Sequence, residues 1–175
     1  MIEQDDVGLW VFGYGSIIWR PNFPHTVAYW ATAVGWSRRF WQGSNDHRGT
    51  VESPGRVLTL VPFSGEQCRG RVFGVAPAQV GLVLDELDYR EKNGYQRHTI
   101  SVDTDELGLI DALTYIASPD NPAWLGDASD DAIANHILKS TGPSGTNRDY
   151  ALSLHKALQA EGIHDKHIQS IAELL

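Results

Sequence analysis

Strand-like segments fill the first part of this chain, and helix-like segments fill the last part. Apolar or alternating runs bounded by glycine, proline and polar residues recur from Leu9 to Ala117, with one helical segment among them. Beyond Ala117 the pattern becomes helical, and the first such segment, Asp130–Lys139, has Ser129 as its expected N-cap. Segregation of this kind is typical of an α+β fold. We therefore expect a small β-barrel-like domain with flanking helices.

Some local expectations are specific enough to test. Arg56–Pro62 and Gly70–Ala76 are predicted to be two strands of a hairpin that turns at Ser64-Gly65-Glu66. Asn147 is predicted to cap a helix that runs to about Ala160. The chain contains six tryptophans, most of them in its first quarter, which favours a core built on aromatic rings over a pocket lined by them.

Length and charge exclude several classes of protein. A chain of 175 residues fits a single domain spanning 1–175, with enough material for a real core. The formal net charge of −8 argues against a nucleic-acid-binding protein, which would need a basic face. There is no run of basic residues for an anionic membrane surface and no apolar stretch long enough to span a bilayer. We expect no nucleic-acid or membrane partner.

The cysteine content and the N-terminus favour a cytoplasmic location. Cys68 is the only cysteine, so an internal disulfide cannot form. The acidic segment Met1–Asp6 has no apolar core and does not resemble a signal peptide. A small acidic domain without an obvious oligomerisation seam is expected to be a monomer.

The segment Ala78–Glu91 carries the sharpest functional signal. Pro77 marks its start and Asn93-Gly94 its end, as expected for a helix. At about 100° per residue, Glu91 falls on the same stripe as the apolar residues Val80, Leu84 and Leu87. A carboxylate that points inward at a helix C-terminus should have a raised pKa, because burial and the helix dipole both disfavour its charge. Glu91 is therefore a candidate general base.

Glu91 could instead have a structural role, as one half of an ion pair. An inward glutamate at a helix end often forms an ion pair, and such pairs also perturb pKa values. Arg90 and Lys92 flank Glu91, and either could be its partner. Periodicity alone leaves this alternative open.

The turn Gly13-Tyr14-Gly15-Ser16 is the second candidate site. It follows the apolar run Leu9–Phe12, and two glycines allow a sharp turn and the close approach of a ligand to backbone amides. The turn is not a dinucleotide fingerprint, because Ile18 stands where the third glycine should be. It is not a P-loop, and Ser16 does not lie in the GxSxG elbow of a serine hydrolase. An ordinary tight turn remains the simpler alternative.

Arginines and histidines offer weaker signals. Arginines are the natural partners of a substrate carboxylate, and four of them surround a long polar loop: Arg38, Arg39, Arg48 and Arg56. The seven histidines show no zinc-binding spacing, so no metal site is expected. His164 and His167 share a helix face and are expected to be solvated.

Four segments resemble ChaC-type γ-glutamylcyclotransferases, in order and over nearly the whole chain. The segment Leu87–Glu91 resembles the acidic motif of that family, and the others are Trp10–Pro21, Gly35–Ser44 with His47–Thr50 and Pro54–Val57, and Gly142–Tyr150. The resemblance implies a barrel-like cyclotransferase fold. It also implies cleavage of glutathione into 5-oxoproline and cysteinylglycine without a cofactor.

The resemblance also assigns roles to individual positions. The catalytic glutamate of the family matches Glu91, which the helix stripe selects independently. The residues that match the γ-glutamyl-binding turn are Tyr14, Gly15, Ser16 and Ile17. The family commonly has leucine where this chain has Ile17, a change that a backbone contact would survive. Arg48, in the His-Arg-Gly motif, is the expected pocket cation.

Two other functions remain compatible with these residues. The same ring closure could act on another γ-glutamyl compound, which analysis of products from a substrate panel would reveal. The fold could also serve as a catalytically silent binding protein, although an acid kept on an apolar stripe argues against this.

Overall fold

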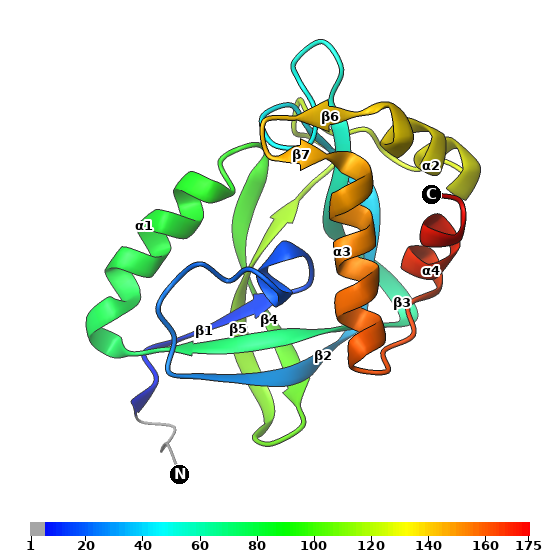
Figure 1. The fold of residues 1–175 in the computed structure, drawn as a ribbon. Helices are drawn as coiled ribbons and strands as arrows, with labels where there is room; N and C mark the ends of the chain where they lie inside the picture. Colours follow the sequence, from blue (N-terminus) through cyan, green and yellow to red (C-terminus); the bar gives the residue numbers. More distant parts are fainter. Residues whose placement is uncertain (1–5) are drawn as a thin grey trace. The chain divides into compact units, whose positions relative to one another are not determined.

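Five strands form a closed barrel in the computed structural model, which describes residues 6–175 (Figure 1). Their order around the barrel is β1-β3-β2-β4-β5, with β1 antiparallel to β3 and parallel to β5. The strands are β1 Leu9–Gly13, β2 Val27–Ser44, β3 Gly55–Val75, β4 Tyr95–Thr104 and β5 Gly108–Ala117. The α+β barrel with flanking helices that the sequence predicts is thereby confirmed.

The α-helices follow the barrel strands in the C-terminal part of the chain, except for α1, which lies between β3 and β4. The α-helices are α1 Val80–Arg90, α2 Asp130–Lys139, α3 Asn147–Ala160 and α4 Lys166–Glu173; the short 3-10 helices η2 Ser16–Ile18 and η3 Pro77–Gln79 and the two-residue strands β6 Thr141–Gly142 and β7 Gly145–Thr146 complete the set. Within residues 6–175, no helix has the length and apolar character needed to cross a membrane. The segment Met1–Asp6, discussed above as lacking a signal peptide, lies outside the described residues except for Asp6.

The described chain divides into two compact units. The first comprises the chain up to Ser37 together with Pro62–Ile116, and the second comprises Arg38–Val61 together with Ala117–Leu175. Strands β2 and β3 each run from one unit into the other.

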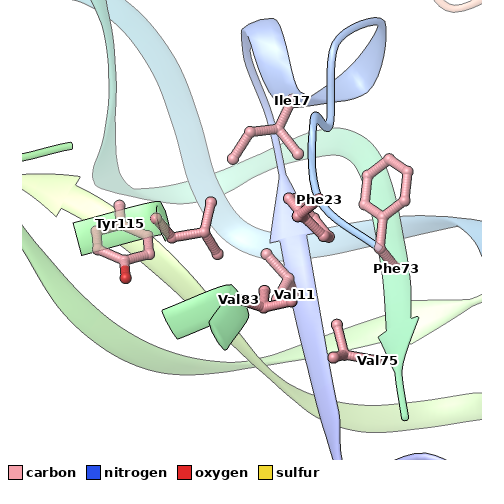
Figure 2. Close-up of a cluster of buried hydrophobic side chains, with 8 residues drawn as sticks. Val11, Ile17, Phe23, Phe73, Val75, Val83 and Tyr115 are labelled. Carbon is pink, nitrogen blue, oxygen red and sulfur yellow. The ribbon is translucent and has the colours of Figure 1, made fainter. Parts of the chain in front are cut away.

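In the first unit, α1 packs its apolar stripe onto a buried cluster formed by β1, β3 and β5 (Figure 2). Val83 and Leu87 of α1 are almost completely buried there beside Val11 of β1 and Val75 of β3. Full burial of one such side chain contributes roughly 1.5–3 kcal/mol. The cluster also contains Ile17, Phe23, Phe73 and Tyr115. This packing fixes which face of α1 points inward.

In the second unit, α2, α3 and α4 pack against one another. Ser129 caps α2, because its side chain accepts a hydrogen bond from the Ala132 amide, and α2 begins and ends at the predicted residues. In α3 the Tyr150 ring packs edge-on against Phe40 of β2, with ring centroids 6.2 Å apart.

The cap of α3 differs from the prediction by one residue, for a physical reason. The Thr146 side chain accepts the hydrogen bond from the Asp149 amide and is the cap. Asn147 is fully buried, and its side-chain amide binds the backbone of Arg56. Asn147 Oδ1 accepts from the Arg56 N–H at 2.7 Å, and Asn147 Nδ2 donates to the Arg56 carbonyl at 2.8 Å. The side chain of Asn147 therefore binds the distant backbone of Arg56 instead of capping α3.

The predicted hairpin within Arg56–Ala76 is wrong. β3 is one continuous strand from Gly55 to Val75, and Ser64, Gly65 and Glu66 lie within it. Gly65 has φ of +84°, a conformation that glycine adopts without strain. Such a residue can interrupt the regular extended backbone without reversing the chain, and the sequence signal is the same as for a turn.

The aromatic core is made of phenylalanine rather than tryptophan. Phe12, Phe40 and Phe73 are fully buried, whereas all six tryptophans are partly exposed. Several tryptophan rings instead meet another ring near the surface, as Trp41 and Trp124 do with centroids 6.1 Å apart.

We predict that Asn147→Ala destabilises the protein more than Thr146→Ala does. The first change leaves the Arg56 N–H and carbonyl buried without their partner, at a cost of about 2–4 kcal/mol of unfolding free energy. The second removes only a helix cap, at a cost of about 1 kcal/mol. Urea unfolding of both variants measures the difference. Equal destabilisation would show that the Asn147 pairing contributes no more than a cap.

Candidate functional site

The turn that follows β1 is held close to the strand by a glycine. A Cβ atom built on Gly13 would lie 2.6 Å from Ile17 Cγ2, closer than real contacts allow, so only glycine fits. Ile17 and Ile18, in η2, are buried at 8% and 5% exposure. The buried side chains of Ile17 and Ile18 therefore hold the turn in place directly after β1.

The Tyr14 hydroxyl provides a second anchor for this turn. It donates a buried hydrogen bond of 2.6 Å to the carbonyl oxygen of Tyr115 in β5. Tyr14, Gly15, Ser16 and Ile17, selected as the substrate-binding turn, thus form a well-fixed element of the first unit.

Glu91 lies directly after α1 and caps its C-terminus. Its N–H donates to the Leu87 carbonyl at 2.8 Å, so the residue continues the helical path by one turn from a fully buried leucine. Its side chain is 19% exposed. The predicted stripe of Val80, Leu84 and Leu87 is confirmed only in part, because Val83 is buried beside Leu87 and Leu84 is only partly buried. Glu91 follows Leu87 by one helical turn, and its carboxylate is largely out of solvent.

Arg90 joins Glu91 to the turn. Its Nε lies 3.3 Å from Glu91 Oε1, and its Nη2 donates to Ser16 Oγ at 2.8 Å. Of the two candidate partners for Glu91, Arg90 is the one that forms the ion pair; the Lys92 ammonium instead lies 4.2 Å from the centre of the Tyr89 ring. Two sequence-selected groups, Ser16 and Glu91, thus contact one guanidinium.

A second polar network fixes the last turn of α1 from the side of β5. The Tyr115 hydroxyl donates to Asp88 Oδ1 at 2.6 Å, and Arg97 of β4 donates to the same carboxylate through Nε at 2.7 Å. These bonds from Arg97 and Tyr115 hold the pKa of the Asp88 carboxyl below its usual range. Burial, together with the bond to Asp88, raises the pKa of the Tyr115 hydroxyl, which therefore stays protonated and can donate.

Sequence reasoning missed the parts of the site that depend on long-range pairing. It considered Arg90 only as a partner for Glu91, and it did not select Tyr115 or Asp88. The position of Asp88, one turn before Glu91, was the only available signal, because its partner Tyr115 lies 27 residues further along the chain.

Arg48 lies in the second unit. Its Nη1 donates to the Thr146 carbonyl at 3.1 Å, and its guanidinium lies 5.6 Å from the centre of the Tyr150 ring. Two other arginines around the loop have structural contacts: Arg38 is fully buried in an ion pair with Asp165, and Arg56 donates to the Phe40 and Gly126 carbonyls.

The expectation that His167 is solvated is wrong. Its side chain is only 10% exposed, and its Nε2 accepts a hydrogen bond of 3.2 Å from the Phe40 amide. Burial, followed by the charge of Arg39, lowers the pKa of this imidazole. His164 is exposed, as expected. Across residues 6–175, no three His, Cys, Asp or Glu side chains are grouped as ligands for a metal ion.

Comparison with known proteins gives a consistent result. A family model described as "ChaC-like protein" matches residues 9–175. Glutathione-specific gamma-glutamylcyclotransferase 1 from Homo sapiens is 40% identical over 177 residues, covering 98% of this chain and 80% of that protein. Gamma-glutamylcyclotransferase 2-3 from Arabidopsis thaliana is 40% identical over 174 residues, covering 95% of this chain and 87% of that protein.

A solved structure shows a similar fold at lower identity. The crystal structure of a yeast γ-glutamyl cyclotransferase specific to glutathione superposes with a TM-score of 0.89. Sequence identity is 30%, and the match covers 96% of this chain and 95% of that one.

We predict that Tyr115→Phe lowers the unfolding free energy by about 1 kcal/mol, because a hydrogen bond to a partly exposed carboxylate is lost. The loss should depend on pH. A carboxyl whose pKa is lowered by folding stabilises the protein above about pH 4, and this contribution disappears as the pH falls through the folded value. The variant should therefore lose less stability than the wild type between pH 7 and pH 3 in urea unfolding.

Tyr89→Phe is the matched control for this prediction. It deletes the same atom from a side chain that is 74% exposed, so we expect a change within about 0.5 kcal/mol. Equal effects of the two substitutions at pH 7 would contradict the role of the Tyr115 bond.

Proposed function

The chain belongs to the ChaC-like protein family, and from this premise we propose that it is a γ-glutamylcyclotransferase that converts glutathione into 5-oxoproline and cysteinylglycine. The observation that carries the proposal is the joining of Ser16 and Glu91 through Arg90. The turn and the carboxylate thereby lie in one unit and within reach of one small substrate. The printed names of the human relative and of the yeast structure specify glutathione, which supports the choice of substrate.

The reaction is an intramolecular substitution. The α-nitrogen of the γ-glutamyl group attacks its own γ-carbonyl carbon, and the new C–N bond closes a five-membered ring. The amide bond to the cysteine nitrogen then breaks, and cysteinylglycine leaves as the amine. Since nucleophile and electrophile belong to one molecule, the protein gains most by holding the substrate in its folded conformer.

Glu91 moves the proton in this mechanism. Its carboxylate accepts a proton from the α-ammonium, which frees the nitrogen lone pair for attack, and delivers it to the departing nitrogen of the dipeptide as the amide bond breaks. The ring nitrogen must lose a second proton to become the lactam N–H. That proton passes through the same carboxylate to the released amine of cysteinylglycine, which becomes an ammonium ion, so that Glu91 ends the cycle as it began. The low exposure of its side chain supports this role, because a base shielded from water does not compete with solvent for the proton.

The turn Tyr14–Ile17 binds the γ-glutamyl end of the substrate. Its backbone amides hold the α-carboxylate or the oxyanion that develops on the γ-carbonyl. Donors fixed before the reaction are effective because they do not reorganise during it. The Tyr14 bond to β5 and the buried Ile17 support this preorganisation. Arg48 supplies a cation for a substrate carboxylate.

The proposal includes the organisation of the chain. Residues 1–175 form one γ-glutamylcyclotransferase domain that works as a cytoplasmic monomer. The passage of β2 and β3 through both units supports one domain, as does the family match over residues 9–175. The single cysteine and the net charge of −8 are compatible with a soluble protein of a reducing compartment.

We predict that Glu91→Gln keeps the fold and lowers kcat by about 10²–10⁴-fold, because it removes the proton acceptor and preserves the shape. Metal-stripped protein is incubated with glutathione, and 5-oxoproline and cysteinylglycine are followed by mass spectrometry. Glu86→Gln is the matched control, since it makes the same change on an exposed residue of the same helix and should leave kcat unaltered.

Three outcomes decide between the possible functions. Products from the wild type and not from Glu91→Gln would support both the reaction and the base. Products only from another γ-glutamyl compound would retain the chemistry and replace the substrate. The absence of products from every γ-glutamyl compound would favour a binding protein of the same fold.

A further inference from the structure

We infer that Arg90 is a positioning residue that sets the placement of Glu91 relative to the substrate-binding turn. The inference rests on the proposed function and extends it to a residue for which the comparisons give no role. Arg90 is the last residue of α1, and its side chain is 24% exposed. Its guanidinium reaches the turn at Ser16, the backbone just beyond the turn and the neighbouring carboxylate.

The guanidinium contacts the substrate-binding turn and the backbone that follows it. In the turn, Nη2 donates to Ser16 Oγ at 2.8 Å. Beyond the turn, Nη1 donates to the carbonyls of Arg20 and Pro21 at 2.9 and 3.0 Å. These carbonyls follow the 3-10 helix η2, where acceptors lack partners within the helix. One side chain thus links Ser16 of the turn to the backbone at Arg20 and Pro21.

The third nitrogen of Arg90 faces the carboxylate. Nε lies 3.3 Å from Glu91 Oε1, and so the same planar group that fixes the turn also orients the proposed base. A guanidinium is rigid, and its donors have fixed relative directions. Displacement of the turn therefore displaces the carboxylate contact as well.

The bond from Arg90 has a consequence for Ser16. A hydroxyl has one proton to donate and two lone pairs to accept, whereas a guanidinium can only donate. Since Nη2 occupies a lone pair of Ser16 Oγ, the serine proton points elsewhere. The hydroxyl can therefore donate to an anionic group of the substrate bound at the turn.

A lysine at position 90 would not reproduce this arrangement. Its ammonium carries the same charge as a point on a flexible stem, without the planar fork that serves the four oxygen acceptors. Arg90→Lys therefore keeps the positive charge and removes only the planar arrangement of donors. We expect kcat/KM for glutathione to fall by about 10²-fold, mainly through kcat, because misplacement of reacting groups by about 1 Å has an effect of this size.

A matched control and a second variant make the test specific. Lys92→Met removes a positive charge two residues away, and we expect unchanged kinetics. Ser16→Ala breaks the Arg90 contact from the other side without altering α1. If both residues act through one contact, the loss in the double variant Ser16→Ala/Arg90→Lys should be smaller than the product of the two single losses. Guanidinium added to Arg90→Ala should restore measurable turnover.

Hydrogen exchange provides a readout that does not depend on turnover. In Arg90→Lys the amides of residues 13–21 should exchange faster than in the wild type, whereas Lys92→Met should leave them unchanged. Unaltered exchange together with kcat/KM within about threefold of the wild type would overturn the inference and leave the proposed function intact. A wild type inactive on every γ-glutamyl compound would refute the proposed function and, with it, the positioning of a base.

Discussion

The packing of Val83 and Leu87 against β1 and β3 determines where the last turn of α1 lies, and the site depends on that position. Both side chains are almost fully buried in the cluster that contains Val11 and Val75. A helix seated in this way cannot rotate without exposing apolar surface. The next inward position along the stripe is occupied by Glu91. A hydrophobic constraint thus directs a carboxylate inward, at the cost of part of its hydration.

Hydrogen bonds and ion pairs fix the exact position of the end of α1, which apolar packing alone leaves free to shift slightly. In the first unit, Asp88 at the end of α1 is bound by Tyr115 and Arg97, and Arg90 binds Ser16. Apolar contacts are non-directional, so they fix a face of a helix and tolerate small shifts along it. Hydrogen bonds are directional and lose strength rapidly when misaligned. Together they fix both the face that α1 turns inward and the position of its last turn.

The second unit uses the same principle for a structural purpose. Asn147 pairs with both backbone groups of Arg56, and Arg38 pairs with Asp165. Asn147, Arg56 and Arg38 are buried, and a buried polar group without a partner destabilises the fold by about 1–3 kcal/mol. An acidic chain can therefore contain buried arginines without dedicating each of them to a ligand.

Local signals were sufficient where structure is decided locally. α2 begins after Ser129 as predicted, because a cap and the helix that it starts are neighbours in sequence. The hairpin in β3 was wrong because Ser64-Gly65-Glu66 is compatible with a turn and with a strand interrupted by one glycine. Thr146 rather than Asn147 caps α3, because the partner of Asn147 lies 91 residues away. His167 was assigned to solvent for the same reason, since Phe40, which covers it, belongs to β2.

In the candidate site, too, local sequence predicted some features and tertiary contacts determined the others. Helical periodicity selected Glu91, because the direction of a side chain on a helix follows from its position in the sequence. Adjacency suggested Arg90 as its partner, which the structure confirms. Nothing local could connect Arg90 to Ser16, which lies 74 residues earlier, or to the carbonyls of Arg20 and Pro21. Sequence therefore identified the chemical groups of the site. The contacts that fix the distances between those groups arise from tertiary structure, and catalysis is most sensitive to those distances.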